Sequence, residues 1–392
     1  MTNYDIVIAG GAMAGMTLAL ALNDASKGKL KVAVVEPCEL DHSKHPGFDS
    51  RCIALSHGTV QILRKYGLWE VLQPLATQID DIHVSDRHHA GMTDISSKDL
   101  FVDALGYVVE LAHVGREFQK LVDAIENIDY LCPDSVESIE RSTKQVSVCL
   151  SSGSQIQANL LVAADGAGST CCELLNMPSA EHDFEQSAVI ANVVTSEQHN
   201  HRAFERFTEN GPVALLPLSE NRMSLVWCMA PKHVNEVIGL SDDEFLSRLQ
   251  SEFGWRLGQF TQVGKRANYP LVLRTRMQNV SHRFAIVGNA AQTLHPIAGQ
   301  GFNLGIRDVA SLVEEIEKCI EDPGQHKVLA GFRTRRESDR INTIQLTSCL
   351  VHLFSNELPA LRLARNLGLF AMDNLPQLKA PLLQQTLGLI DR

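Results

Sequence analysis

The residues with the clearest potential for chemistry lie in one stretch, 283–308. It contains His295 and, four residues later, the group Gly-Gln-Gly at 299–301. The apolar run before them predicts a buried strand, and the apolar stripe after Phe302 predicts a helix. Glycines at the start of a helix leave backbone N–H groups accessible at the positive end of the helix dipole. The stretch therefore predicts a site for a flat or anionic group, and an ordinary glycine-rich turn is the alternative.

A second candidate site begins near the N-terminus. Residues 5–9 form a continuous apolar run, which is typical of a strand inside a parallel sheet. The turn 10–15 (Gly-Gly-Ala-Met-Ala-Gly) and a helical pattern follow, and the next predicted strand, 31–36, ends at Glu36, about 20 residues after the turn. In a dinucleotide site the helix N-terminus binds the pyrophosphate, and such a carboxylate accepts hydrogen bonds from ribose hydroxyls. Ala12 stands where this fingerprint has its second glycine, so a packing turn with an incidental Glu is the alternative.

The totals of the chain limit what these elements can build. With 392 residues the chain is too long for one simple core, which predicts two domains. A formal net charge of −11 argues against a nucleic-acid partner. The nine cysteines have no paired spacing, which favours reduced thiols over a disulfide framework or a metal site. The sequence has neither a signal-peptide pattern nor a run of roughly 18 apolar residues, so we expect a cytoplasmic protein without a membrane span.

The run from His295 to Asp308, His-Pro-Ile-Ala-Gly-Gln-Gly-Phe-Asn-Leu-Gly-Ile-Arg-Asp, resembles the signature of the flavin-dependent aromatic hydroxylases of ubiquinone biosynthesis. The resemblance extends over essentially the whole chain. Two further runs, Ala-Phe-Glu-Arg-Phe-Thr (203–208) and Val-His-Leu-Phe (351–354), are most similar to the bacterial subgroup that acts on 2-polyprenyl-6-methoxyphenols. The resemblance implies a non-covalently bound FAD, NADPH or NADH as a transient co-substrate, and O2.

Two further pairs of residues resemble family fingerprints. Asp165-Gly166 follows a predicted strand, and in the family this pair borders both the flavin and the nicotinamide route. The family often carries an arginine where this chain has Cys172. Gly288-Asn289 matches a Gly-Asp pair whose aspartate holds a ribityl hydroxyl, and an amide would hold it without charge. A strand-ending turn is the alternative for Asp165.

Two arginines complete the expected cofactor site. By resemblance Arg51 reaches the phosphates or the ribose, and Arg116 contacts the ribityl–phosphate region; a surface-loop position and a helix-capping role are the alternatives. The full set of expected cofactor-binding residues is Gly10, Gly11, Ala12, Met13, Ala14, Gly15, Glu36, Arg51, Arg116, Asp165, Gly166, Gly288, Asn289, Pro296, Gly299, Gln300, Gly301, Phe302 and Asn303.

The order of the predicted elements indicates an α/β fold. Strands alternating with helices predict a Rossmann-like FAD-binding domain on a parallel sheet, and closely spaced strands after residue 187 predict an antiparallel-sheet substrate domain with one helix, from Ser241 to Glu252. Helices are expected again after Arg340. The expected domains are 1–78, 107–182 and 277–340 for FAD, 79–106 and 183–276 for the substrate, and 341–392 as a C-terminal helical region.

The resemblance implies hydroxylation of a 2-polyprenyl-6-methoxyphenol para to its hydroxyl, through a flavin C4a-hydroperoxide. His295 would lie beside the flavin ring and orient or deprotonate the phenol; structural bonding before Pro296 is the alternative. Other functions remain open: hydroxylation of another ring position or another phenol, reduction of isoprenoid double bonds, or a non-catalytic flavoprotein subunit. The last is favoured only by the departures at Ala12, Cys172 and Asn289.

The C-terminal region differs from the body of the chain. Residues 340–392 carry five basic and three acidic side chains, whereas the whole chain is acidic. Their apolar residues include Leu350, Val351, Leu353, Phe354, Leu358, Leu361, Leu367, Leu369, Phe370 and Met372. One interpretation is a helical cap on the core. The other is an apolar mouth that admits a prenyl chain or docks on the inner membrane face or on a ubiquinone-biosynthesis protein complex.

Overall fold

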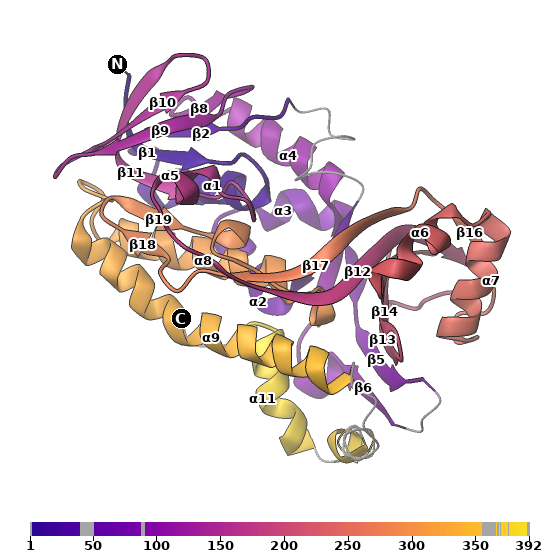
Figure 1. The fold of residues 1–392 in the computed structure, drawn as a ribbon. Coiled ribbons are helices and arrows are strands. Elements are labelled where there is room, and N and C mark those ends of the chain that lie inside the picture. Colours follow the sequence, from indigo (N-terminus) through magenta and orange to yellow (C-terminus); the bar gives the residue numbers. More distant parts are fainter. Residues whose placement is uncertain are drawn as a thin grey trace.

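The computed structural model describes residues 2–39, 51–87, 91–354, 366, 368, 370–374 and 376–389. They form a mainly parallel sheet with its helices and a second, mainly antiparallel sheet, which two long strands connect (Figure 1). The α/β fold class expected from the sequence is confirmed, including the helices at the C-terminal end.

Five strands form the parallel part of the first sheet, in the order β19-β11-β1-β2-β8. Their bounds are Phe284–Ile286, Gln155–Ala163, Thr2–Ala9, Val32–Val35 and Ile128–Leu131. They are rich in buried Val, Ile, Leu and Ala, because two helices cover one face and two further strands with a short helix cover the other. Antiparallel pairing adds β9 (Val136–Arg141), β10 (Val146–Leu150) and β18 (Val280–Ser281). Because the central strands are parallel, their carboxyl ends meet at one edge, where α/β sheets bind ligands.

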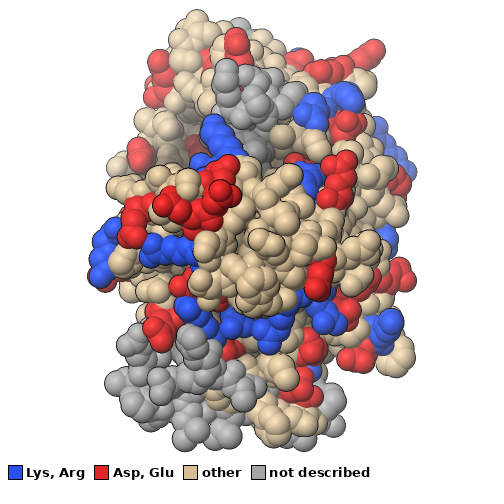
Figure 2. All heavy atoms as spheres, turned by 90° about the vertical axis from the view of Figure 1, so that its right-hand side faces the viewer, with Lys and Arg blue, Asp and Glu red and all other residues tan. Residues whose placement is uncertain are grey.

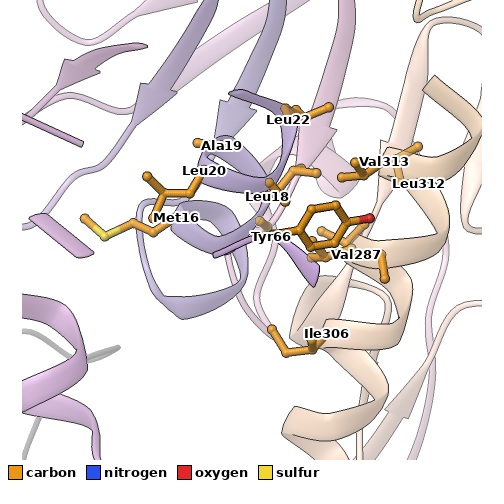
Figure 3. Close-up of a cluster of buried hydrophobic side chains, with 14 of the residues drawn as sticks. Met16, Leu18, Ala19, Leu20, Leu22, Tyr66, Val287, Ile306, Leu312 and Val313 are labelled. Atoms are coloured by element: carbon orange, nitrogen blue, oxygen red, sulfur yellow. The ribbon is translucent and has the colours of Figure 1, made fainter. Parts of the chain in front are cut away.

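Two helices cover the centre of this sheet, α1 (Met13–Ser26) and α8 (Gln300–Glu317). Leu18 and Leu22 of α1 point toward Leu312 and Val313 of α8, and Val287, just after β19, belongs to the same cluster (Figure 3). The other helices of this part are α2 (His57–Lys65), α3 (Trp69–Leu72), α4 (Leu111–Asp123) and α5 (Thr170–Leu174). A small sheet of β3 (Cys52–Ser56), β7 (Gly106–Glu110) and β4 (Thr77–Ile79) lies beside them. This core fixes the two helix N-termini relative to the strand ends.

The second sheet is antiparallel except where β13 pairs with β5. Its order is β20-β17-β12-β15-β14-β13-β5-β6, and β16 pairs with β12. The bounds are Gln292–Thr293, Ala267–Thr275, Ala180–Thr195, Arg222–Met229, Gly211–Pro217, Arg202–Thr208, Asp81–Asp86 and Met92–Ser96, with Phe260–Val263 for β16. The long strands β12 and β17 run side by side from the first sheet into the second (Figure 1). The second sheet is therefore tied directly to the strand edge of the first.

Two helices, not the one expected, cover the second sheet. α7 (Asp242–Phe253) matches the expected helix, and Ser241 caps it by accepting from the Glu244 N–H. The expectation of a single helix was wrong, because α6 (Pro231–Gly239) precedes it. Its signal was in the sequence: Pro231 at a helix start with Val234 and Val237 buried behind it.

The C-terminal helices are α9 (His326–Phe354) and α11 (Pro376–Thr386). α9 begins earlier than expected, since helix formation was predicted only after Arg340. One uninterrupted helix thus crosses the expected boundary between 277–340 and 341–392. Since no helix or strand ends at that boundary, the domain division stays a prediction. The expected apolar residues Leu358, Leu361, Leu367 and Leu369 lie outside the described residues.

Within the described ranges, no helix combines the length and hydropathy needed to cross a bilayer. On the face that carries α6 and α7, Lys and Arg side chains are interspersed with Asp and Glu around an uncharged area (Figure 2). Acidic side chains accompany the basic ones on this face, which agrees with the acidic balance of the chain.

Candidate cofactor and substrate site

One cavity of about 1070 Å³ lies at the carboxyl-end edge of the parallel sheet and extends to the second sheet and the C-terminal helices. It unites most of the predicted site residues. Those that line it are Gly10, Ala12, Met13, Ala14, Glu36, Arg51, Asp165, Gly166, Gly288, Asn289, Pro296, Gly299, Gln300, Gly301, Phe302 and Asn303. The predicted residues that do not line it are Gly11, Gly15, Arg116 and His295. Its volume is at the upper end of the range for small-molecule sites, which gives room for a large ligand or two ligands.

The turn between β1 and α1 requires glycine at two positions, Gly10 and Gly15, and brings a third, Gly11, close to side chains. Gly10 has a φ of 101°, and a Cβ there would lie 2.4 Å from the Ala164 carbonyl oxygen. A Cβ on Gly15 would lie 1.8 Å from the Gly10 carbonyl oxygen, and one on Gly11 would lie 2.8 Å from the Tyr130 hydroxyl. These contacts bring helix, strand and neighbouring loop closer than any side chain permits.

The N-terminus of α1 is open toward the cavity. Its N-cap Ala12 has φ −76° and ψ −170°, and no side chain caps the helix. The first N–H groups of a helix have no partner within the helix, so here they are available to an anionic ligand. Since the backbone of Ala12 is in a conformation open to any residue, the missing second glycine causes no strain.

Glu36 is fixed at the end of β2. Its Oε2 accepts from the Gly11 N–H at 2.6 Å and its Oε1 from the Cys38 N–H at 3.0 Å. The side chain is 5% exposed and lines the cavity. The carboxylate therefore has the fixed orientation that ribose recognition requires.

Asp165 and Gly166 follow β11 at the same edge of the sheet. Oδ2 of Asp165 accepts from the Cys171 N–H at 3.1 Å. Its Oδ1 is buried without a hydrogen-bond partner among the described residues. A buried acceptor without a donor is destabilising, so an orphaned oxygen on a cavity-lining residue points to a ligand donor. Gly166 has a φ of 83°, and no protein atom lies within 4 Å of the position that a Cβ would take there.

The N-terminus of α8 is brought to the cavity by its own glycines. The N-cap Gly299 has a left-handed conformation and no side chain caps the helix. Further along the helix, a Cβ on Gly305 would lie 3.0 Å from the Cα of Gly288. The helix thus crosses directly over the loop that follows β19, and its free N–H end faces the same cavity as that of α1.

Two polar residues of this helix start connect it to its neighbours. Asn303 donates to the carbonyls of Ala54 at 2.9 Å and Gly299 at 2.7 Å, and accepts from the Ser56 N–H at 2.8 Å. Gln300 donates to the Ala298 carbonyl at 2.9 Å and to a carbonyl of α11 at 3.0 Å. Both line the cavity, yet their side-chain amides hold the loop, β3 and α11 around it.

A buried charge network behind α8 was not anticipated from the sequence. Arg307 pairs with Asp339 at 2.8 Å, and Arg336 pairs with Asp308 at 2.8 Å. Asp308 also accepts from the Gly288 N–H at 3.2 Å. Burial opposes the ionisation of Asp339, but the adjacent Arg336 and Arg307 hold its pKa below the usual value. The Arg-Asp end of the signature run therefore joins α8 to α9 and holds the Gly288 loop, since breaking one member would leave a buried charge unpaired.

His295 is buried next to the cavity and does not line it. Its Nδ1 accepts from the Ile297 N–H at 3.2 Å, which leaves Nε2 as the donor to Oε1 of Gln186 at 3.1 Å. Its ring meets that of Phe184 edge-on. Burial lowers the pKa of His295 to about 4. A neutral imidazole with both nitrogens bonded within the protein fits the structural alternative, in which His295 shapes the loop before Pro296.

The two predicted arginines have different positions. Arg51 lines the cavity, and its carbonyl accepts from the Leu111 N–H at 2.9 Å. Arg116 is exposed on α4 and lies outside the cavity lining. Of the two, only Arg51 is placed to meet a ligand in this cavity.

The opposite wall of the cavity is apolar. The second sheet contributes Ile82, Val84, Ala203, Ala214, Leu216 and Val226, and the C-terminal region contributes Leu350, Leu353, Phe354, Met372, Leu382 and Leu383. Phe354 stacks on Phe207 with 3.5 Å between the ring centroids. One acidic side chain interrupts this wall: burial raises the pKa of Glu205 to about 8. The sequence alone marks Glu205 only as a member of the family run 203–208.

Comparisons with known proteins agree with this geometry. A family model described as FAD binding domain matches residues 3–345. The chain is 33% identical over 387 residues to "Ubiquinone hydroxylase UbiL" of Rhodospirillum rubrum, covering 98% of this chain and 89% of the relative. It is 30% identical to "3-demethoxyubiquinol 3-hydroxylase" of Escherichia coli, covering 99% and 100%. The fold is similar to that of p-nitrophenol 4-monooxygenase PnpA from Pseudomonas putida, with a TM-score of 0.81, 19% identity and 99% coverage of both chains.

Proposed function

We propose that this protein hydroxylates a 2-polyprenyl-6-methoxyphenol para to the hydroxyl. The chain belongs to the FAD binding domain family, whose model it matches from residue 3 to residue 345. The protein is a flavoprotein monooxygenase, and the ring position and substrate are the proposed part. The names of the relatives, a ubiquinone hydroxylase and a demethoxyubiquinol hydroxylase, support a prenylated ring as substrate.

The observation that carries the proposal is the union of two unlike surfaces in one cavity. On one side lie the glycine turn 10–15, called the glycine cradle below, and two helix N-termini that no side chain caps. On the other side lies the apolar wall of the second sheet. FAD fits the first surface. The α1 N-terminus would hold its pyrophosphate, Glu36 its ribose, and the orphaned Oδ1 of Asp165 would accept from one of its hydroxyls. We propose Arg51 and Asn289 as further contacts, since both line the cavity.

Bound FAD supplies the redox chemistry, in which NADPH or NADH delivers two electrons and O2 delivers the oxygen atom. The chain has one dinucleotide fingerprint, and FAD would occupy it. The nicotinamide would therefore dock only transiently. The N-terminus of α8, with Gly299 to Gly301 at its start, would stabilise negative charge at the edge of the flavin ring.

The apolar wall suits a substrate that is mostly hydrocarbon. Side chains of the second sheet, α9 and α11 would pack on the prenyl tail, with a gain of about 0.8 kcal/mol per buried CH2 group. The same side chains exclude water from the reacting ring. This favours the interpretation of the C-terminal region as part of the substrate site over that of a simple cap.

Anaerobic flavin reduction tests this function. Purified protein is mixed with NADPH without O2, with and without a 2-prenyl-6-methoxyphenol, and the loss of flavin absorbance is followed. We expect the phenol to accelerate reduction, and we expect one hydroxylated product per NADPH once O2 is added. A reduced prenyl double bond formed without O2 would identify an isoprenoid reductase. Reduction without any product from any phenol would identify a non-catalytic flavoprotein subunit.

A further inference from the structure

Glu205 lies in the middle of the cavity-facing side of the second sheet. Strand register pairs it with Val84 on β5 and Ala214 on β14. The same row continues to Thr93 on β6 and Val226 on β15. Residues directly opposite one another share a face of the sheet, and all five line the cavity. Among the described residues of this sheet that line the cavity, Glu205 alone carries a carboxyl.

The neighbouring rows place Glu205 close to the loop at the start of α8. Phe207 is two residues further along the same face and packs with Ile297, in that loop. Two residues of a strand span about 7 Å, so Glu205 is the next residue on this face after the one that packs on the loop. On its other side Ala203 pairs with Ile82, and both line the cavity together with Leu216. Glu205 therefore lies where a ring beside the loop would present a polar group.

No group among the described residues compensates this carboxyl. It has no hydrogen-bond or ion-pair partner in the part of the chain that the structure describes. Burial alone raises the pKa of Glu205 to about 8, without a contribution from a neighbouring charge. Burial and then the Glu205 charge also raise the pKa of Cys228, two residues from Val226 on the same face of β15. An acidic side chain left unpaired on an apolar wall is destabilising unless a ligand uses it.

The other ionisable groups near Glu205 are already engaged or lie elsewhere in the cavity. On the same face of the sheet, Asp86 receives a hydrogen bond from Asn366. Arg274 donates to Glu181 and to the Ala167 carbonyl. The remaining ionisable residues that line the cavity are Glu36, Cys38, Arg51, Cys52, Asp165 and Tyr269.

We infer that Glu205 is a catalytic residue that binds the phenolic hydroxyl of the substrate and accepts its proton, an assignment that rests on the proposed function. As the proton passes to the carboxylate, the electron pair of the broken O–H bond moves into the ring and raises electron density at the para carbon. That carbon forms the new C–O bond with one oxygen atom from O2. Its hydrogen leaves as a proton, and Glu205 returns its own proton to the phenolic oxygen. NADPH supplies the two electrons, and the second oxygen atom leaves as water.

Glu205 fits the role of general base, and His295 does not. A general base must be able to reach the proton it takes, and its pKa is best near the working pH. Glu205 lines the cavity and satisfies both conditions, whereas the buried imidazole of His295 satisfies neither.

The test compares wild type with Glu205→Gln, and with Glu209→Gln as the control. Glu209 is an exposed acid just beyond the same strand and does not line the cavity. An amide keeps the shape but cannot take the proton, so we expect kcat for a 2-prenyl-6-methoxyphenol to fall by about 100-fold or more, with a smaller rise in KM, of about tenfold at most. FAD content should be equal in all three proteins.

The pH profile separates a proton acceptor from a structural carboxyl. Wild-type kcat/KM should rise through the pKa of about 8, because the base is active only when ionised, and the rise should be absent from Glu205→Gln. The melting temperature should change with pH in the opposite direction to kcat/KM. The unfolded chain releases this proton near the ordinary pKa of 4.5 and the folded chain near 8. Wild type should therefore lose stability as the pH rises from about 4.5 to 8, and the variant should not. Equal kcat and an unchanged pH profile in the variant would overturn the assignment.

A binding measurement keeps this result separate from the proposed function. Flavin absorbance is titrated, without NADPH, with the phenol and with its O-methyl ether. Wild type should prefer the phenol by about tenfold at high pH, and Glu205→Gln should lose that preference. If wild type forms no hydroxylated product but shows this preference, the proposed function fails and the contact stands. If wild type forms product without the preference, the function stands and the Glu205 assignment fails.

Discussion

The two sides of the cavity are built by opposite means. The cofactor side consists of backbone: Gly10, Gly15 and Gly288 remove side chains so that N–H groups and strand ends approach a ligand. The substrate side consists of side chains: rows of Val, Ile, Leu and Ala from five strands, with Glu205 as the one acid among the sheet residues described there. Backbone geometry serves a ligand that never changes, whereas a wall of side chains can be altered one residue at a time.

This contrast predicts different tolerance to mutation. A Cβ in the cradle collides with backbone that cannot move away. A substitution in the wall changes the fit of the substrate and leaves the cofactor side unchanged. Single substitutions on each side test this separation, and the cradle should give the largest effect.

Gly15→Ala should abolish FAD binding. The added Cβ would lie 1.8 Å from the Gly10 carbonyl oxygen, so helix α1 must separate from β1. The measurement is the flavin content after purification in the presence of excess FAD. Gly239→Ala is the control, since no atom lies within 4 Å of its Cβ position, and it should keep its flavin. A yellow, fully loaded Gly15→Ala protein would mean that the cradle is not where FAD binds.

Gly301→Val should weaken FAD binding by about tenfold or more without unfolding the protein. The nearest atom to a Cβ at this position is 3.9 Å away, on Leu294. The added side chain therefore fits within the protein but takes up space in the cavity. We expect a melting temperature of the FAD-free protein within a few degrees of wild type and a higher Kd in a flavin titration. An unchanged Kd would remove the α8 N-terminus from the cofactor site.

Leu353→Asn should raise KM about tenfold for a long-chain phenol and much less for a short-chain one. Leu353 lines the cavity, and burying a leucine against a hydrocarbon chain is worth about 1.5 to 3 kcal/mol. Turnover of both substrates is compared at equal FAD content. Ile341→Asn, an exposed position of the same helix, should leave both KM values unchanged. Loss of fold in Leu353→Asn would instead support a purely structural cap.

His295→Asn should retain FAD and change the response to acid. The folded-state pKa of about 4 is below the usual 6.5, so the unfolded chain binds the proton first as pH falls. Wild type should therefore lose stability between pH 6.5 and 4, by on the order of 3 kcal/mol in all, and the variant should lose less. The measurement is the melting temperature across this window, with the exposed His326→Ala as control. A product yield per NADPH equal to zero in His295→Asn would restore a catalytic role for the imidazole.

The same contrast decides what could be predicted from the sequence. The glycine cradle was predictable because its constraints are local: Gly15 meets Gly10 within one turn of chain. The parallel strands β1, β2 and β19 were predictable because each is a continuous apolar run, whereas β8 contains Asp129 and was not expected. Most of the predicted cofactor residues line one cavity for these reasons, although their contacts with FAD remain a proposal.

The rest depends on partners that are distant in the sequence. The role of His295 could not be decided because Gln186, its hydrogen-bond partner, is 109 residues away on β12. The pair of Asp308 and Arg336 joins two helices, so neither residue alone indicates a buried network. Glu205 is exceptional only because its neighbours on four other strands are uncharged, which strand register alone reveals. The polar residues of this network on α9 also interrupt its apolar pattern, so the start of the helix at His326 was not predicted.

The most direct test of the central claim is the fate of labelled oxygen. The protein is supplied with FAD, NADPH, isotopically labelled O2 and a 2-prenyl-6-methoxyphenol, and the product is analysed by mass spectrometry and NMR. We predict one labelled oxygen atom in the product, at the ring carbon para to the original hydroxyl. Label at another ring carbon, or an unlabelled product, would contradict the account.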